Sequence, residues 1–370
     1  MTIQLTIEEL PLLLETVKSR ALDLPFVSAF GCFNNNSASN IKRWGTRRYK
    51  EVLNTFSQQV PKTICPFDYV VGQRTKQLWI PLWKLRDFFI TQDVFKEYTP
   101  LIRRVIELLT DRNQPIQMGG SFLYDLFRFL VKAVLNTVED NQHAHQIQDG
   151  HLIIKDQFET KRFRNCDREY EIDGLGPMSS SLRNFVVLLM NVDATDIDQK
   201  SSTPTIFSQF LDKAVLRAEL DDRHDDVAEL ERGRIHLQNA LKRKENGEAG
   251  VKEMLNATLY GCRQYLNDID MNGIHTMLRT YVRTEGGFNT FGKPAKSWLS
   301  YQNMNVEHKL QRTFEKHLAD MGIKTLSHIY DGCIVYGHPT EEQIKIAEKM
   351  TIEEVGVIMK WVIKKTWSKK

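Results

Sequence analysis

The chain has 370 residues and a net charge of +3, and its 41% hydrophobic and 26% charged residues are typical of a globular protein. No apolar run approaches the roughly 20 residues that a membrane helix needs, and the first residues lack the basic segment and cleavage site of a secretory signal. The five cysteines are scattered without a C-x-x-C pair, so we expect an intracellular protein with neither a zinc site nor a disulfide scaffold.

The first part of the chain is predicted to be mainly helical. Thr6 and Glu9 form a capping-box pattern at the start of one expected helix. Apolar residues recur at helical spacing over residues 94–112 and again over 121–141. Residues 1–145 are therefore expected to form a helical region.

Short strands and long helices follow from about residue 150. The expected strands cover residues 151–156, 191–198, 324–330, 333–337 and 358–366. The expected helices cover Thr205–Leu216, Arg223–Glu245, Val251–Val282 and Asn305–Met321. This order predicts an α+β fold whose sheet has helices on one face and is interrupted by a helical insertion over about 220–295.

Asp198 is predicted to lie at the end of a strand, in the sequence DIDQKSSTP. Thr203 and Pro204 would then start a helix, because Thr is a good N-cap and Pro is favoured at the first helical position. This would place Asp198 beside a turn with exposed backbone groups. Taken alone, an aspartate near a helix start is more often a capping residue.

Lys252, Asn256 and Tyr260 are spaced by four residues and are expected to line one face of a helix. A cation, an amide and an aromatic ring on one stripe suit a nucleotide, with the cation at the phosphates and the amide and ring at the sugar and base. A surface lysine next to a core tyrosine is the simpler interpretation of the same pattern.

Asp331 and Gly332 lie between two apolar runs, and Asp-Gly in this setting predicts a β-hairpin. A hairpin tip exposes a carboxylate on rigid backbone, and we expect Asp331 to meet Asp198 at the end of a neighbouring strand. Two such carboxylates would form an oxygen-ligand site for Mg²⁺ (or Mn²⁺). A pair of such ions about 4 Å apart would activate a 3′-hydroxyl and stabilise the leaving pyrophosphate.

The order of these three stretches resembles motifs A, B and C of palm-domain polymerases. Lys252 followed eight residues later by Tyr260 and Gly261 is similar to the B motif of family A DNA polymerases and single-subunit phage-type RNA polymerases. The DID and DG forms of the other two motifs resemble the transposon–viral polymerase family, a divergent family A offshoot in virophages, large DNA viruses and mobile elements. The resemblance covers about residues 174–337.

The resemblance implies a role for each motif residue. Asp198 and Asp331 would be the catalytic metal ligands, with the carbonyl of Gln199 as a third. The other implied contacts are Lys252 with the incoming triphosphate, Tyr260 with its sugar and the templating base, Arg183 with template or primer, and Glu307 in a supporting role before motif C. Asn256, Thr203 and Gln199 complete the expected nucleotide-binding residues.

The resemblance also implies a polymerase right hand with an RRM-like antiparallel palm sheet. The palm would comprise residues 146–219 and 296–370, the fingers-like helical insertion 220–295, and the thumb-like region 1–145. The implied activity is that of a template-directed DNA polymerase of a virus or mobile element, without proofreading. Its partners would be a template–primer, nucleoside triphosphates and other replication proteins, with no membrane.

Three positions depart from the family A pattern. Glu248 occupies the place of an arginine and is expected to repel a triphosphate, unless Arg243, Lys244 or Lys242 substitutes. Gly332 replaces a second acidic residue after Asp331. The small Thr203 stands where DNA polymerases carry a bulky residue, which keeps an RNA polymerase or primase as the alternative. An inactive palm that only binds nucleic acid is a further alternative.

Overall fold

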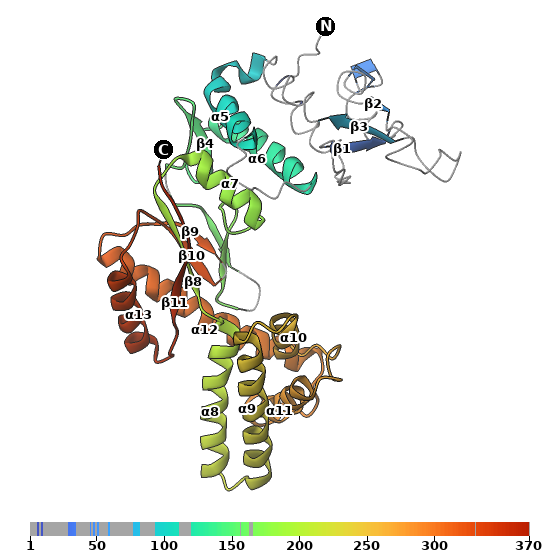
Figure 1. Cartoon of the computed structure of the whole chain (residues 1–370), viewed down its shortest axis with the longest axis vertical. Helices are drawn as coiled ribbons and strands as arrows, with labels where there is room; N and C mark the ends of the chain where they lie inside the picture. Colours follow the sequence, from blue (N-terminus) through green and yellow to red (C-terminus); the bar gives the residue numbers. More distant parts are fainter. Residues whose placement is uncertain are drawn as a thin grey trace. The chain divides into compact units, whose positions relative to one another are not determined.

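The computed structural model describes residues 93–110, 120–155, 157–162, 166–329 and 331–369, together with three short strands and a few single residues before residue 93. The fold is α+β, as predicted (Figure 1). The chain divides into two compact units: Met1–Glu159 with Asp173–Val192 and Lys369–Lys370, and Thr160–Ile172 with Asp193–Ser368. In the part of the chain described, no helix has both the length and the apolar character to cross a membrane.

The first unit combines helices with two small sheets. Its helices are η1 (Asp93–Tyr98), α5 (Thr99–Thr110), α6 (Gly120–Val138) and α7 (Ser180–Met190). Its strands are β1 (Ala29–Asn34), β2 (Gln58–Gln59) and β3 (Gln77–Pro81) in the order β1-β3-β2, and the hairpin of β4 (Gln146–Gln148) and β5 (His151–Ile153).

The helices predicted over 94–112 and 121–141 are confirmed by α5 and α6. The prediction of a mainly helical region did not include the strands before residue 93, which form a three-stranded sheet. The first predicted helix lies outside the described residues except near Thr6, whose backbone N–H donates to Glu9 Oε2 at 3.0 Å.

The second unit contains a four-stranded sheet. Its strands are β8 (Ala194–Gln199), β9 (Thr325–Ile329), β10 (Gly332–Tyr336) and β11 (Trp361–Trp367), in the order β11-β8-β10-β9 with every pair antiparallel. The helix α13 (Glu341–Val355), which was not predicted, joins β10 to β11. The chain therefore follows the β-α-β-β-α-β order of ferredoxin-like sheets, with a long helical insertion between the first two strands.

One face of this sheet packs on α13 and on α12 (Lys293–Asp320). Ile197 of β8 and Val335 of β10 are fully buried with Phe314 of α12, whose ring stacks on Trp361 at 4.3 Å between centroids. Side chains alternate along a strand. Asp198, next to Ile197, is therefore directed to the face opposite the helices.

The helical insertion begins at Ser202 rather than near the predicted residue 220, and it forms a bundle with its own core. Its helices are α8 (Ser202–Leu220), α9 (His224–Glu245), α10 (Val251–Leu259) and α11 (Ile269–Gly286), and α8 and α9 form a long helical hairpin (Figure 1). A Cβ on Gly233 of α9 would lie 2.2 Å from the Cβ of Met277 on α11. The glycine thus allows these two helices to pack closely.

The single helix predicted over Val251–Val282 is two helices. Gly261 has φ +78° and ends α10, with its N–H donating to Thr258 O at 2.8 Å and that of Cys262 donating to Ala257 O at 2.9 Å. This is the Schellman pattern of a helix C-terminus, which glycine favours because the left-handed conformation costs it nothing. Asp268 then caps α11 through its side chain.

Candidate active site

The two predicted acidic residues lie side by side on the second unit's sheet. Asp198 is in β8, and Asp331 lies in the turn just before β10, where the neighbouring Gly332 pairs with Asp198. The backbone N–H of Gln199 donates to the carbonyl of Asp331 at 2.8 Å. The two carboxyl groups are close enough for Asp331 to raise the pKa of Asp198. The structure thus brings together two residues that are far apart in the sequence.

Gly332 explains how closely the two strands approach. It is the first residue of β10 and does not adopt a left-handed φ, so its predicted place in the turn is wrong by one residue. A Cβ at this position would lie 2.3 Å from the carbonyl oxygen of Ile197 and 3.0 Å from the Cα of Asp198. Glycine is therefore required for the contact between β8 and β10 that sets the spacing of the acidic pair.

The acidic pair has a cationic neighbour that the sequence did not reveal. Lys364 of β11 forms an ion pair with Asp198. Burial first, and then the charge of Asp331, raise the pKa of Asp198 to about 7, against the lowering effect of Lys364. Burial lowers the pKa of Lys364, but the hydrogen bond to Asp198 and the acidic charges outweigh it and raise that pKa.

Two carboxylates meet the minimum protein contribution to a magnesium site that also takes waters and substrate phosphates. In the part of the chain that the structure describes, no group of three or more His, Cys, Asp or Glu side chains converges to complete a metal site. The raised pKa of Asp198 indicates a pair of like charges that a divalent cation would stabilise. The residues present fit such an ion.

This pKa predicts how stability changes with pH. Since the pKa of Asp198 is about 7 in the folded chain and 3.8 ordinarily, the folded state binds more protons between these values and its stability falls as pH rises through that window. We therefore expect the melting temperature of Asp198→Asn relative to wild type to be higher at pH 8 than at pH 5. Mn²⁺ should raise the melting temperature of wild type alone. Thermal melts of both proteins at both pH values give this difference in melting temperature. A difference between variant and wild type that is the same at pH 5 and pH 8 would contradict the prediction.

The start of α8 departs from the prediction in a way that matters for the site. Its N-cap is Ser201, in the left-handed conformation and without a side-chain cap, so Thr203 is inside the helix. Ser202 and Thr203 are therefore available for other contacts. Ser202 donates to Glu307 Oε1 at 2.6 Å, and Thr203 Oγ1 lies 3.2 Å from the hydroxyl oxygen of Tyr260.

Glu307 is a buried acid behind the aspartate pair. It is 6% exposed, and its Oε2 lies 3.4 Å from Arg168. Burial raises the pKa of Glu307, Arg168 and Ser202 lower it, and Asp331 raises it further. The amide of Gln199 donates to the Glu307 carbonyl at 3.2 Å, while Gln199 Oε1 is buried and accepts no hydrogen bond from the residues that the structure describes. Arg168 was missed because only the fold brings it to α12.

Tyr260 belongs to the insertion and lies near Asp331 and Thr203. Burial is the main cause of its raised pKa, and the charges of Glu307 and Asp331 also raise it. Its side chain is nevertheless 40% exposed. As the C-cap of α10, Tyr260 keeps the predicted stripe with Lys252 and Asn256, because its backbone N–H donates to Asn256 O at 3.1 Å.

Three lysines gather near the start of α8. Lys244 Nζ donates to Ser201 Oγ at 2.5 Å. Burial lowers the pKa of Lys244, as do the charges of Lys252 and Lys200. A helix N-terminus carries unpaired N–H groups and a positive partial charge, so these lysines add to a place that already favours an anion.

The glutamate that was expected to repel a triphosphate is neutralised. Glu248 pairs with Arg243 at 2.7 Å, and Arg243 also pairs with Asp268 at 2.9 Å and Asp270 at 3.0 Å. The hydrogen bonds that Arg243 donates to these acids raise its pKa. Of the three basic residues considered as substitutes for the missing arginine, Arg243 is engaged in this network, and Lys244 lies with Lys252.

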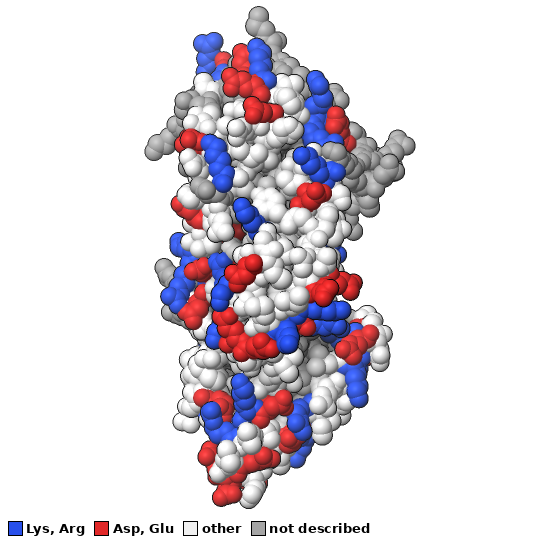
Figure 2. All heavy atoms as spheres, turned by 90° about the vertical axis from the view of Figure 1, so that its left-hand side faces the viewer, with Lys and Arg blue, Asp and Glu red and all other residues white. Residues whose placement is uncertain are grey.

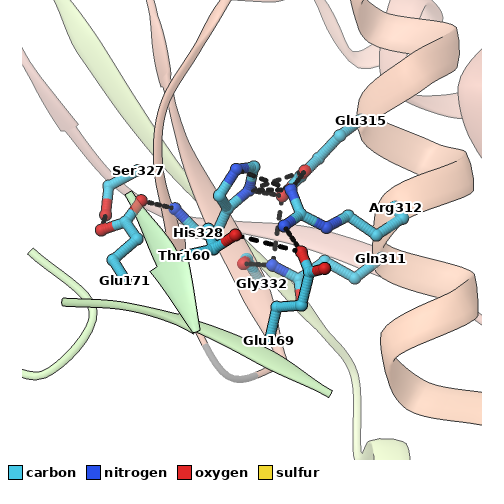
Figure 3. Close-up of polar contacts among 9 residues, drawn as sticks. All are labelled: Thr160, Glu169, Glu171, Gln311, Arg312, Glu315, Ser327, His328 and Gly332. Atoms are coloured by element: carbon cyan, nitrogen blue, oxygen red, sulfur yellow. Dashed lines mark hydrogen bonds and ion pairs between the residues drawn. The ribbon is translucent and has the colours of Figure 1, made fainter. Parts of the chain in front are cut away.

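A polar network supports the hairpin that carries Asp331 (Figure 3). Glu171, from the hairpin of β6 (Thr160–Arg162) and β7 (Glu169–Glu171), accepts from Ser327 Oγ and from the backbone N–H of His328, both at 2.7 Å. On α12, Gln311 donates to the carbonyl of Gly332 at 2.6 Å. The network therefore ties β9 and the first residue of β10 to neighbouring elements.

Arg183 is the one predicted site residue in the other compact unit. It lies in the first turn of α7, where its backbone N–H donates to Ser179 O at 2.9 Å. Its contact with template or primer stays a prediction.

No protein-family model matches the chain, and no curated protein matches its sequence.

Proposed function

We propose that the chain is a template-directed nucleic-acid polymerase that transfers nucleotides to a primer 3′-hydroxyl, with a DNA polymerase of a virus or mobile element as the preferred form. The observation that carries the proposal is the closeness of Asp198, in β8, to Asp331, in the turn just before the adjacent antiparallel strand β10. The sheet would be the palm of a right hand, the helical insertion the fingers, and the N-terminal part the thumb-like region.

The roles of the residues follow from their chemistry. Mg²⁺ or Mn²⁺, when bound, would lower the pKa of the 3′-hydroxyl and stabilise the charge on the leaving pyrophosphate. Asp198 and Asp331 would hold the ions. Lys364 pairs with Asp198, and its charge would compete with an ion for that carboxylate, so we expect it to give up this contact when an ion binds. Tyr260 and Thr203 would lie at the sugar of the incoming nucleotide.

Lys244 and Lys252 would hold the triphosphate beside the start of α8. Lys244 takes the place that family A polymerases fill with an arginine, since Arg243 is engaged with three acids. Its lowered pKa comes from burial near other cations, and a polyanion would relieve that repulsion. On the face drawn in Figure 2, basic and acidic residues are interspersed. The assignment of Lys244 and Lys252 to the triphosphate therefore depends on their positions and not on the overall charge of the surface.

Lys244→Ala is expected to raise the KM for the nucleoside triphosphate about tenfold or more, because hydrogen bonds to charged groups contribute about 1.5–3 kcal/mol. Lys213→Ala is the matched control, since Lys213 is an exposed lysine on α8, away from the start of that helix. Steady-state incorporation at varied triphosphate concentration gives KM for each protein. Equal KM values for the two variants would remove Lys244 from the triphosphate site.

The sugar preference separates the preferred function from its alternative. Thr203 is small, which favours an RNA polymerase or primase on the same fold, and its contact with Tyr260 leaves the tyrosine beside the expected sugar. Primer extension with dNTPs and with NTPs decides between them. Extension with dNTPs supports the DNA polymerase, and exclusive use of NTPs would replace it with the RNA polymerase or primase. No incorporation with either, in Mg²⁺ or Mn²⁺, would favour an inactive palm that only binds nucleic acid.

A further inference from the structure

A pocket opens beside Tyr260. It has a volume of about 370 Å³, within the range of about 300–1,000 Å³ typical of ligand pockets. Its lining consists of Tyr260, Gly292, Lys293, Lys296, Ser297, Ser300 and Tyr301. Apart from Tyr260 these residues belong to the start of α12 and its N-cap, and none of them is used by the proposed nucleotidyl transfer.

The position of Lys296 is fixed by the glycine after Tyr260. A Cβ on Gly261 would lie 2.9 Å from Lys296 Cγ and 3.0 Å from its Cδ, so the lysine stem crosses the glycine backbone. The Lys296 ammonium lies 5.5 Å from the centre of the Phe291 ring. Gly261 therefore does more than end α10: its missing side chain makes room for a cation at the pocket.

More cations lie near His275, whose ring packs against that of Phe291 at 5.2 Å between centroids. Burial lowers the pKa of His275, and the charges of Arg263, Lys296 and Arg279 lower it further. Within the part of the chain that the structure describes, Arg263, Arg279, Lys293 and Lys296 form no ion pair with a carboxylate. This contrasts with Arg243 in the same helical insertion, which pairs with three acids.

We infer that this pocket and its basic rim bind single-stranded nucleic acid, with one nucleotide in the pocket. Aromatic rings that stack on bases, combined with cations that follow the backbone, are the chemistry by which proteins hold single strands. Tyr260 and Tyr301 supply rings, Lys293 and Lys296 supply cations at the pocket, and Arg263 and Arg279 extend the basic rim beyond one nucleotide. Binding of a single strand does not depend on the proposed function. Tyr260 lines the pocket and also contacts Thr203 near the acidic pair, so if the chain is a polymerase, the bound strand would be its template.

Binding of a fluorescently labelled oligothymidylate, measured by anisotropy in EDTA, tests the inference without metal or catalysis. The Lys293→Ala/Lys296→Ala variant should bind more weakly and should flatten the slope of log affinity against log salt by about 0.7 per lost phosphate contact. Tyr301→Ala should weaken binding about tenfold or more, and Tyr301→Phe much less, because the ring stacks on a base. Lys309→Ala, an exposed lysine later on α12, is the control, and thermal melts verify folding.

Three results would overturn the inference. The first is an affinity and salt slope for the double-lysine variant equal to those of Lys309→Ala. The second is a loss of affinity in the variants that is as large for a duplex of the same length as for the single strand, which would indicate contact with the phosphate backbone alone. The third is complete displacement of the oligonucleotide from the pocket by free nucleoside triphosphate at its KM. If the protein bound the strand through this pocket but incorporated no nucleotide, the inference about the pocket would hold and the proposed polymerase function would be contradicted. If it incorporated nucleotides and the variants bound the strand like wild type, the polymerase function would hold and the inference about the pocket would be contradicted.

Discussion

Asp331→Asn is expected to lower the Mg²⁺-dependent incorporation rate by about 10³-fold or more, because stabilisation by a catalytic metal ion is worth several kcal/mol and each ~1.36 kcal/mol is a factor of ten. The carboxamide has nearly the shape of the carboxylate, so the turn and the backbone bond from Gln199 should persist. The substitution also removes one of two like charges in contact, so the folded protein should not lose stability. Single-turnover primer extension measures the rate, and a thermal melt verifies the fold.

Asp193→Asn is the control for this experiment. Asp193 is an exposed acid just before β8, at the opposite end of that strand from Asp198. Its substitution should leave the rate within a few-fold of wild type. If Asp331→Asn incorporated nucleotides as fast as Asp193→Asn, the acidic pair would not be the metal site, and the polymerase would need another one.

Gly332→Ala is expected to lower the incorporation rate by about 10²-fold, the cost that misplacement of catalytic groups by about 1 Å can impose. The added Cβ would lie 2.3 Å from the carbonyl oxygen of Ile197 and 3.1 Å from Asp198 Oδ1. Since backbone atoms cannot move aside as a flexible side chain can, β10 must shift away from β8. Asp331, the residue before Gly332, would move with it and leave Asp198.

The Gly332 variant needs a control that loses similar stability without touching the site. Gly322 has φ +81° and open space around its Cβ position, so Gly322→Ala strains the backbone after α12 but leaves the acidic pair alone. We expect Gly322→Ala to melt at a lower temperature and to retain its rate. Equal rates for Gly322→Ala and Gly332→Ala, after correction for the folded fraction, would show that the spacing of β8 and β10 does not govern activity.

The parts of the fold that the sequence predicted depend on local patterns. Alternating apolar residues and an Asp-Gly pair placed the β9–β10 hairpin, because strand period and turn chemistry act over a few residues. The meeting of Asp198 and Asp331 followed from motif order, and the strand pairing brings them together. The break after Tyr260 was missed because an isolated glycine inside a helical pattern is tolerated and does not by itself mark the end of a helix.

The remaining site residues depend on long-range packing that no local pattern contains. Lys364 is one of two adjacent lysines on β11, and its pairing with Asp198 depends on an irregular register between Ile363 and Lys365. The contact between Arg168 and Glu307 joins segments that are distant in the sequence. Ser201 was not recognised as the cap of α8 because Thr203 followed by Pro204 is the stronger N-cap pattern.

The most direct measurement of the central claim is anomalous diffraction from crystals grown with Mn²⁺, a primer–template and a non-hydrolysable nucleoside triphosphate. We expect an anomalous peak between the carboxylates of Asp198 and Asp331, at ligand distance from both, with the triphosphate between that peak and the Lys244 and Lys252 ammonium groups. A peak bound elsewhere, or Lys364 still paired with Asp198 and no metal at the acidic pair, would contradict the account.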